Sequence, residues 1–407
     1  MTKNILIVGA GIEACEGIRI AKAMGLGLIV ADGNPDAPGF DMADWRIVAS
    51  TYDGKAILNE LSTLIEQGLK IDGAIAMCAD VPMSVAIITN ALGLPGLSLE
   101  SAFWVSDKLA MKDRLKTYGV PIPNYADVSD ISILAQRAAE LGLPLIIKPV
   151  DSRGARGVQL IESMEMLEPA WHIAAAESPT SRVMIEEYLP GPQFSTETLA
   201  SKGHYFTLGF ADRNYEWLTR TKPYIIENGG DAPTALSPKH KAEVISVLEQ
   251  AAQALAITQG VIKGDMVYTP QGAKVIEVAG RLSGGFFSTT QIPLATGVNF
   301  IEKAIKLALG DDLSPDEVTP EKTQAVAIRY LDLPCGVVDS IEGMADANAA
   351  PGVELLKLFI TPGSQVQSLS NHTQRSGFAI AVGDSKQQAI TRANDALALI
   401  RVKFRKQ

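Results

Sequence analysis

Short apolar runs alternate with helical patterns over the first hundred residues, and this alternation restricts the fold more than any other feature of the chain. Apolar runs at 5–8, 26–31 and 73–77 have the length of buried strands, and the segments at 12–24 and 56–67 have helical periodicity. Strands and helices that alternate in this way form βαβ units, in which the strands pair in parallel. The sequence therefore predicts an α/β domain with helices on both faces of a parallel sheet.

The first of these strands ends in the glycine-containing segment GAGIEACEG at 9–17. Gly9 and Gly11 allow a tight turn at a helix N-terminus, where exposed amides can hold an anion. Asp32 ends the second strand, where dinucleotide-binding folds keep the acid that binds ribose. Ala14, however, occupies the position of the third glycine of a GxGxxG motif. A nicotinamide-dependent oxidoreductase is one interpretation, but an ordinary strand-to-helix turn without a dinucleotide explains the segment better.

A second pattern begins near residue 106, where a helix at 107–118 is followed by glycine and proline, which commonly end helices. The segments expected after it are helices at 131–141, 239–256 and 300–309, strands at 145–148 and 183–185, and alternating runs at 195–200, 204–210, 264–268 and 274–278. Such alternation is typical of antiparallel sheets. The tail after residue 310 is rich in turns and closes with a helix at 385–401, which the basic run from 401 to 406 is expected to end.

Charge and composition exclude several classes of protein. A net charge of −10 repels nucleic acid and anionic membranes, and the sequence predicts neither a signal peptide nor a membrane-spanning run. Three widely spaced cysteines form neither a disulfide framework nor a metal-binding pair, which favours a cytoplasmic protein. The four histidines are scattered, so we expect oxygen atoms to bind any metal.

Two lysines and a loop have the chemistry of a polyphosphate site. Lys108 begins the helix at 107–118, and Lys148 ends a strand just before the loop DSRGARG at 151–157. An ammonium group beside flexible, glycine-containing backbone can bind phosphate, because the glycines let amides approach the oxygens. The loop is not a Walker A motif. Taken singly, each lysine is also compatible with a solvated surface residue, and the loop with a mobile turn.

Two further segments carry polar side chains in informative positions. The hinge MIEEYLPGP leaves a strand and turns at a proline, so it can offer backbone groups and a carboxylate to a purine. The segment GDMVYTPQGAKVIEVAGR predicts a hairpin in which Asp265 and Glu277 lie on adjacent strands and point to one face. Two facing carboxylates repel each other unless a cation such as Mg²⁺ lies between them. Arg281 follows this pair, and alone it is also compatible with a structural salt bridge.

The order of these features, from the two lysines and the glycine loop to EEYL and an acid pair with a following arginine, resembles the ATP-grasp superfamily over nearly the whole chain. The segments PLATGVNFIEKAIKLALG and RSGFAIAVGDSKQQAITRA resemble its biotin-carboxylase-like branch, especially L-amino-acid ligases and related carboxylate-amine ligases. The N-terminal βαβ unit is similar to the pre-ATP-grasp domain of that superfamily. This similarity argues against a nicotinamide cofactor at Gly9 and Gly11.

The resemblance implies a role for each candidate residue. ATP phosphates are expected at Lys108 and Lys148, under a lid loop that includes Ser152, Arg153, Gly154, Arg156 and Gly157. Adenine is expected at the hinge formed by Glu186, Glu187, Tyr188 and Leu189, with Glu186 in contact through its side chain and Glu187 and Leu189 through their backbone; Glu197 serves the ribose or lies nearby. Mg²⁺, or Mn²⁺ in its place, is expected at Asp265 and Glu277, and the acyl phosphate at Arg281.

Three departures from the family pattern bear on the chemistry. Ala279 replaces the asparagine of Glu-x-Asn-x-Arg, so one metal ligand is missing and the number of metal ions stays open. Gln193 stands where many relatives have glutamate. The segment RLSGGF lacks the acid of the RxQVEH motif of biotin carboxylases, which disfavours activation of bicarbonate.

The resemblance thus implies a ligase that joins a carboxylate to an amine with release of ADP and phosphate. A carboxylase or formate-type ligase and a noncatalytic nucleotide-binding relative are the alternatives. The expected domains are a Rossmann-like pre-ATP-grasp domain at 1–105, an ATP-grasp domain at 106–310 with a mobile lid at 119–188, and a small α+β subdomain at 311–407. The substrate pocket is expected at 205–233 and at the SGG turn that follows Arg281. The implied partners are small-molecule substrates and a second copy of the chain.

Overall fold

The computed structural model describes residues 2–405. The N-terminal domain contains a parallel sheet with the strand order β3-β2-β1-β4. Its strands are β1 (Asn4–Val8), β2 (Gly27–Asp32), β3 (Trp45–Val48) and β4 (Gly73–Ala76), and its helices are α1 (Cys15–Ala23), α2 (Gly54–Glu66) and α3 (Pro82–Leu92). The predicted α/β domain is therefore confirmed.

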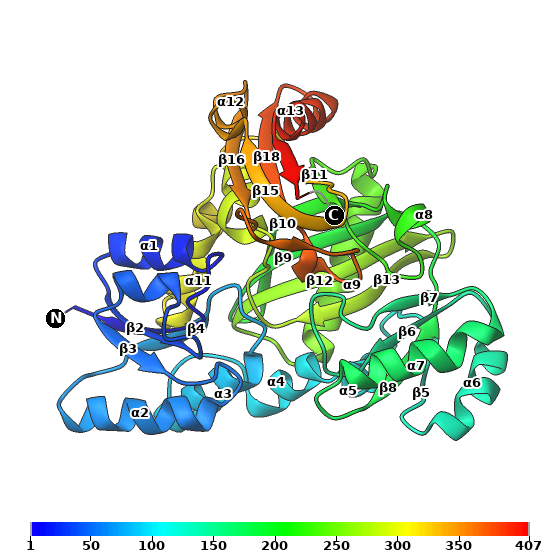
Figure 1. The fold of residues 1–407 in the computed structure, drawn as a ribbon. Helices are drawn as coiled ribbons and strands as arrows, with labels where there is room; N and C mark the ends of the chain where they lie inside the picture. The colour runs from blue at the N-terminus through cyan, green and yellow to red at the C-terminus, as the bar shows by residue number, and fades with distance from the viewer. Residues whose placement is uncertain (1, 406–407) are drawn as a thin grey trace.

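Helices cover both faces of this parallel sheet, because alternate strand residues point to opposite sides. Ile5 and Ile7 pack with α1 and with α11 (Phe300–Ala308), whereas Leu6 and Val8 pack with α2 and α3. Figure 1 shows the sheet between these two helical layers.

The turn after β1 is stabilised by residues of the chain itself. Gly9 has a φ of +102°, a conformation that favours glycine, and the Asp32 carboxylate accepts a hydrogen bond from the Ala10 amide at 2.7 Å. Asp32 therefore supports the turn, and its position alone gives no reason to expect a ribose there.

A large antiparallel sheet forms the centre of the molecule, in the order β13-β12-β9-β10-β11-β14-β18-β16. Its strands are β9 (Gln193–Ser201), β10 (His204–Asn214), β11 (Gly229–Ala232), β12 (Gly260–Thr269), β13 (Gly272–Ala279), β14 (Ala325–Tyr330), β16 (Val353–Leu358) and β18 (Gly377–Gly383). The helices of this region are α4 (Leu99–Ser106), α5 (Lys108–Thr117), α8 (Leu218–Thr221), α9 (Pro238–Ala254), α10 (Ile292–Thr296) and α11. The four alternating runs predicted from the sequence are confirmed as β9, β10, β12 and β13.

The alternation along β12 separates an apolar face from a functional one. Ile262 and Met266 pack in the core that α9 covers, whereas Lys263 and Asp265 line a cavity on the other face. The period of two residues in a strand produces this division. Helix α9 thus closes one side of the sheet and leaves the polar side available.

A smaller antiparallel sheet, β5-β8-β6-β7, lies in the segment that was expected to form a lid, and it is called the lid sheet below. Its elements are β5 (Tyr125–Asp127), α6 (Leu134–Leu141), β6 (Leu145–Pro149), β7 (Gln159–Ile161), α7 (Leu167–Ala176) and β8 (Val183–Glu187). Helices α6 and α7 pack on this sheet around a separate apolar core (Figure 1). The candidate phosphate loop at 151–157 connects β6 to β7.

The C-terminal region corrects one expectation. Helix α13 (Lys386–Ala398) ends before residue 401, and Arg401–Phe404 forms strand β19, which pairs with β15 (Gly336–Glu342). Val402 packs in the core below α13, whereas Arg401 and Lys403 are exposed and pair with Glu342, so the RVKF segment has the period of a strand. Residue 406 of the predicted helix end lies outside the described residues.

Six strands lie among the turns of the C-terminal region within residues 311–405. β14, β16 and β18 extend the large central sheet, and β17 (Gln365–Val366), β15 and β19 form a separate three-stranded sheet. Helix α12 (Met344–Asn348) packs against β16 and α13. None of the helices within residues 2–405 is long and apolar enough to cross a membrane. The domain boundaries near 105 and 310 stay predictions.

Candidate active site

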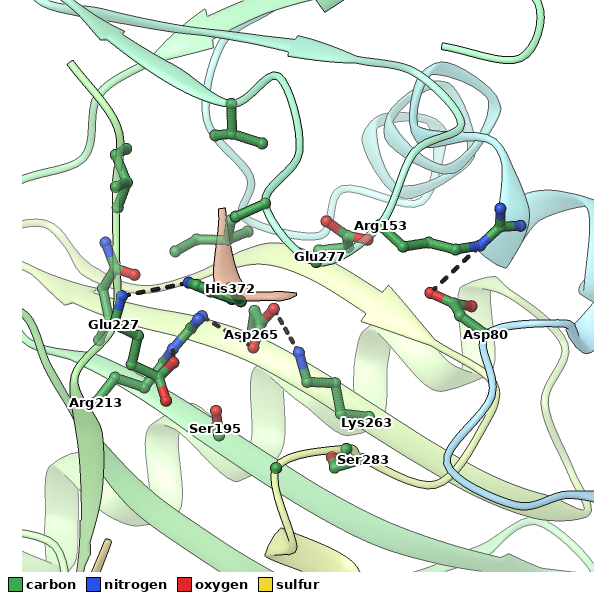
Figure 2. Close-up of a pocket in the computed structure, with 18 of the residues that line it drawn as sticks. Asp80, Arg153, Ser195, Arg213, Glu227, Lys263, Asp265, Glu277, Ser283 and His372 are labelled. Carbon is green, nitrogen blue, oxygen red and sulfur yellow. Dashed lines mark hydrogen bonds and ion pairs between the residues drawn. The ribbon is translucent and has the colours of Figure 1, made fainter. Parts of the chain in front are cut away.

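A cavity of about 560 Å³ lies where the N-terminal domain, the lid sheet, the central sheet and the C-terminal region meet. Figure 2 shows its floor, formed by the central sheet, with Asp80 reaching in from the N-terminal domain and His372 from the C-terminal region. Nearly all of the residues singled out from the sequence line this cavity. The candidates that do so are Lys108, Lys148, Ser152, Arg153, Gly154, Arg156, Glu186, Glu187, Tyr188, Leu189, Asp265, Glu277 and Arg281.

Lys148 shares a buried carboxylate with a second lysine. Its Nζ lies 2.5 Å from one oxygen of Glu186, and the Nζ of Lys112 lies 3.2 Å from the other oxygen and donates to the Ile276 carbonyl at 2.8 Å. Burial lowers the pKa of Lys112 to about 8, although the negative charge of Glu186 raises it in part. Burial raises the pKa of Glu186, but the two lysines outweigh it and hold that pKa below its usual range. Glu186 is therefore an ionised carboxylate that holds both lysine side chains beside the cavity.

Sequence reasoning did not single out Lys112. Its one signal was the spacing, because Lys112 follows Lys108 by four residues and the two therefore lie on the same side of α5. Lys112 is 1% exposed. Lysines are almost never buried to this degree unless they are paired, and here Glu186 is the partner.

Lys108 connects the helix to the loop and to the second acid of the hairpin. Its Nζ donates to the Ser152 carbonyl at 2.8 Å and lies 3.4 Å from Glu277 Oε1. Asp107 caps the helix by accepting from the Ala110 amide at 2.8 Å, so the first turn of α5 and the Lys108 ammonium group are held in place.

The loop at 151–157 contacts both outer domains. Arg153 lies 3.8 Å from Asp80 and stacks on Tyr52 at 4.7 Å, and the Gly154 carbonyl accepts from the His372 amide at 3.0 Å. Gly154, Ala155 and Gly157 all have positive φ, which explains the glycines. Gly157 does not line the cavity, since it packs against Ala174 of α7, and its predicted contact with phosphate is not supported by its position.

The hinge after β8 also lines the cavity. The Glu187 carboxylate accepts a hydrogen bond from the Asn124 backbone amide at 3.2 Å, and the Tyr188 backbone amide donates to the Pro144 carbonyl at 3.3 Å. These two contacts fix the course of the hinge. The Glu186 side chain is held by the two lysines. Its expected contact with adenine, and those of the backbone of Glu187 and Leu189, stay predictions.

Asp265 and Glu277 face each other across adjacent strands, as the hairpin predicted. Asp265 lies 3.1 Å from Arg213 and 2.5 Å from Lys263. Burial raises the pKa of Asp265, but Arg213 and Lys263 outweigh it and hold that pKa well below its usual range, so the carboxylate is ionised. The Asp265 Oδ1 atom is buried and makes no hydrogen bond.

This donor set fits a hard divalent cation. Two carboxylates that face one cavity provide the oxygen ligands that Mg²⁺ prefers. Within residues 2–405, no three His, Cys, Asp or Glu side chains form a preformed metal site, and Ala279 is buried where an asparagine ligand was expected. A divalent cation bound to Asp265 and Glu277 would take its remaining ligands from phosphate oxygens or water.

Arg281 pairs with an acid from another domain. Its Nη2 lies 3.2 Å from Asp80, while its Nε is buried without a hydrogen bond. Burial lowers the pKa of Arg281, but Asp80 raises it more, so the guanidinium stays charged. The N-terminal domain thus completes the site, and the sequence had given no reason to single out Asp80.

Glu197 lies below the cavity and not on its surface. It is fully buried in β9, and its Oε1 accepts from the Ser283 amide at 2.8 Å and the Ser288 hydroxyl at 2.6 Å. Burial raises the pKa of Glu197 to about 7. Glu197 thus lies near the site without lining the cavity, and it positions the turn after Arg281. Its contact with ribose stays a prediction.

The expected substrate region lines the cavity in part. Residues of the 205–233 segment, including Arg213, Tyr215 and Glu227, lie there together with Ser283, Gly284 and Gly285. Arg213 pairs with Glu227 at 2.5 Å as well as with Asp265, and it was not found from the sequence.

Comparison with known families agrees with this architecture. The family model described as an ATP-grasp domain matches residues 105–285, and the model described as L-amino acid ligase C-terminal domain 2 matches residues 329–405. The lid sheet, the paired acids and Arg281 all lie within the first match.

The chain is similar to several ligases and transferases. It is 22% identical to an L-arginine-specific L-amino acid ligase of Bacillus subtilis, over 83% of this chain and 81% of that protein. It is 24% identical to a formate-dependent phosphoribosylglycinamide formyltransferase of Burkholderia pseudomallei, over 98% and 95%. Its fold matches the crystal structure of an L-amino acid ligase from Bacillus licheniformis with a TM-score of 0.85 at 19% identity, over 100% and 99% of the two chains. The chain therefore contains an ATP-grasp domain at 105–285, followed by the C-terminal domain 2 of L-amino acid ligases at 329–405.

Proposed function

We propose that this ligase activates a carboxylic acid with ATP and joins it to an amine, releasing ADP and phosphate. A carboxylate oxygen attacks the γ phosphorus, the bond to the β-phosphate oxygen breaks, and ADP leaves. The amine nitrogen then attacks the acyl carbon, the bond to phosphate breaks, and the nitrogen loses a proton. Both products of ATP are accounted for, and the new bond is an amide.

One observation carries this proposal: the facing pair Asp265 and Glu277 lies in the same cavity as Lys108, Lys148 and Arg281. The lysines supply positive charge for the β and γ phosphates, where negative charge develops during transfer. In this proposal ATP binds between the lid sheet and the central sheet, with its adenine toward the hinge at 186–189.

Asp265 and Glu277 are the residues that would hold Mg²⁺, which when bound neutralises phosphate charge. Lys108 and Lys148 orient the phosphates from the other side. The loop at 151–157, which contacts Asp80, Tyr52 and His372, excludes water that would otherwise hydrolyse an acyl phosphate.

Arg281 is positioned to stabilise the oxyanion that forms when the amine attacks. Removal of one such preorganised donor typically lowers kcat by about 10²- to 10³-fold. We expect Arg281→Ala to show a loss of this size in amine-dependent ADP release, with nucleotide affinity changed far less. The measurement is a coupled ADP assay together with nucleotide titration. Full activity of Arg281→Ala contradicts this assignment.

A formate-type ligase or carboxylase is the second candidate, favoured by the similarity to the formyltransferase over nearly the whole chain. The turn after Arg281 argues against a carboxylase, because Ser283, Gly284 and Gly285 offer no acid to activate bicarbonate. ADP release screened against formate, bicarbonate and amino acids, with mass spectrometry of the products, separates the candidates. An amide formed from an added amine supports the ligase, and ADP release that needs only formate or bicarbonate contradicts it.

We also propose that the enzyme acts as a cytoplasmic homodimer. The three cysteines form no disulfide within residues 2–405, as is common in reducing compartments. Light scattering after size exclusion tests the assembly, and a monomer at working concentration contradicts it.

A further inference from the structure

Arg375 is a cavity-lining cation that the proposed phosphate chemistry does not use. It lies two residues before β18, and its guanidinium stacks on the Tyr330 ring at 3.7 Å. Its Nε donates to the His372 carbonyl at 2.9 Å and its Nη1 to the Glu227 carbonyl at 3.3 Å. Both contacts are with backbone oxygens, so the charge is oriented but not neutralised.

No acid pairs with Arg375 among residues 2–405, and this distinguishes it from other arginines of the cavity. Arg153 and Arg281 share Asp80, and Arg213 pairs with acids of the central sheet. Arg156 also lacks an acid partner, but it belongs to the loop already expected above the phosphates. The Nη2 group of Arg375 makes no hydrogen bond to any described residue. It is therefore the available donor for an anion on this side of the cavity.

Glu13 provides the complementary charge. It comes from the turn before α1, and its Oε2 accepts from the Gly285 amide at 2.9 Å. No lysine or arginine pairs with Glu13 in the described part of the chain. The Tyr330 hydroxyl lies beside the same glycine, since a Cβ placed on Gly285 would be 3.1 Å from it. Tyr330 thus has Arg375 on its ring face and the Glu13 turn at its hydroxyl end.

We propose that Arg375 determines the specificity for the amine substrate, by binding the carboxylate of an α-amino acid whose amino group lies at Glu13. This inference rests on the proposed ligase function and assigns the two residues of this chain that hold its amine. A guanidinium and a carboxylate form paired hydrogen bonds, which give direction as well as charge. The amino end then lies at the turn that follows Arg281, where the acyl carbon is expected.

The reacting carboxylate is a poor candidate for Arg375. That group must approach the γ phosphate, at Lys108, Lys148 and the paired acids, and Arg375 contacts none of them. A phosphate dianion is also disfavoured, because only one guanidinium is available and the acids Glu13 and Glu227 line the same cavity. Arg375 and Glu13 instead match the carboxylate and the ammonium group of a zwitterion.

The variants Arg375→Gln and Glu13→Gln test the assignment, with Arg220→Gln as the matched control. Arg220 also stacks on an aromatic ring, Trp217 at 4.5 Å, but it pairs with Asp332 and does not line the cavity. The probes are an accepted amino acid, its carboxamide, and phosphoethanolamine. Steady-state kinetics give KM for each amine and for ATP, and calorimetry gives amino-acid affinity in the presence of ADP and Mg²⁺.

We expect the wild-type enzyme to prefer the amino acid over its carboxamide by about 10- to 150-fold, the usual range for a hydrogen bond to a charged group. Arg375→Gln should raise KM for the amino acid by a similar factor and remove this preference, with KM for ATP and kcat within about twofold. Glu13→Gln should also raise KM for the amino acid, and Arg220→Gln should change nothing. An unchanged KM for ATP shows that a variant is folded.

Equal use of the amino acid and its carboxamide by the wild-type enzyme overturns the inference, as does a preference retained in Arg375→Gln. A preference for phosphoethanolamine that Arg375→Gln removes overturns it in favour of a phosphate anchor. These results leave the ligase proposal intact. The ligase proposal itself fails only if no amine yields an amide. If turnover is absent, equal calorimetric affinity for the amino acid and its carboxamide still overturns the inference.

Discussion

Glu197 makes a quantitative prediction about pH and stability. The side chain is fully buried, its Oε1 accepts from Ser283 and Ser288, and its Oε2 is buried without any hydrogen-bond partner. Burial raises the pKa of Glu197 from its usual 4.5 to about 7. The folded protein therefore holds a proton that the unfolded chain releases in this interval.

The direction and size of the effect follow from this difference. Between pH 4.5 and 7 the folded state binds more protons than the unfolded state, so the stabilisation is complete below pH 4.5 and is lost as pH rises toward 7. Each pH unit corresponds to about 1.4 kcal/mol. The Glu197 contribution to the free energy of unfolding therefore falls by about 3 kcal/mol across the interval.

Glu197→Gln isolates this contribution, because glutamine has the shape of the protonated acid and does not titrate. Urea unfolding followed by tryptophan fluorescence, at steps from pH 4.5 to 8, gives the free energy of unfolding of both proteins. We expect the variant to gain about 3 kcal/mol relative to the wild type as pH rises. Glu60→Gln, on the exposed surface of α2, is the control and should run parallel to the wild type. Parallel curves for Glu197→Gln and the wild type refute the reasoning.

Two further predictions concern buried charge. Lys112→Met removes one partner of the Lys112–Glu186 pair, and we expect a loss of about 3 kcal/mol in the free energy of unfolding, measured in urea; a loss below about 1 kcal/mol contradicts the assignment. Asp265→Asn should abolish the increase in ATP affinity that Mg²⁺ causes while nucleotide binding without metal persists, as titration with and without Mg²⁺ will show. A normal response to Mg²⁺ in that variant contradicts the proposed metal site.

The contacts between domains give the C-terminal region a direct part in the site. The His372 amide binds the Gly154 carbonyl of the lid loop, and Arg375 holds the carbonyl of Glu227. Burial lowers the pKa of His372 well below its usual value, and the charges of Arg375 and Arg213 add to this effect. His372 is therefore neutral, and it accepts a hydrogen bond from the Glu227 amide at 3.2 Å.

Local sequence patterns were sufficient to identify the parts of the site that lie within one segment. The hairpin with Asp265 and Glu277, the strand end at Lys148 and the loop at 151–157 all depend on residues within about 20 positions of each other. Their geometry follows from strand alternation and turn chemistry, which short segments determine. Except for Asp151 and Gly157 of the loop, these residues therefore line the cavity as expected.

Residues that act across domains escaped this reasoning. Asp80 and Glu13 come from the N-terminal domain and Arg375 from the C-terminal region, and each looks like an ordinary surface residue in its own segment. Lys112 reads as one more charge on a helix until Glu186, 74 positions away in the chain, is placed beside it. Burial and pairing are properties of the assembled molecule.

The C-terminal strands show the same limit for the fold. The RVKF segment has the alternation of a strand, yet its basic residues and a preceding helix favoured a helix end, and only pairing with β15 decided the outcome. The sequence by itself determined which segments alternate with period two or 3.6 and which side chains have the chemistry to bind phosphate. The tertiary structure alone decided which charges meet and which lose water, because Coulomb energy and desolvation depend on distances between segments that no local pattern encodes.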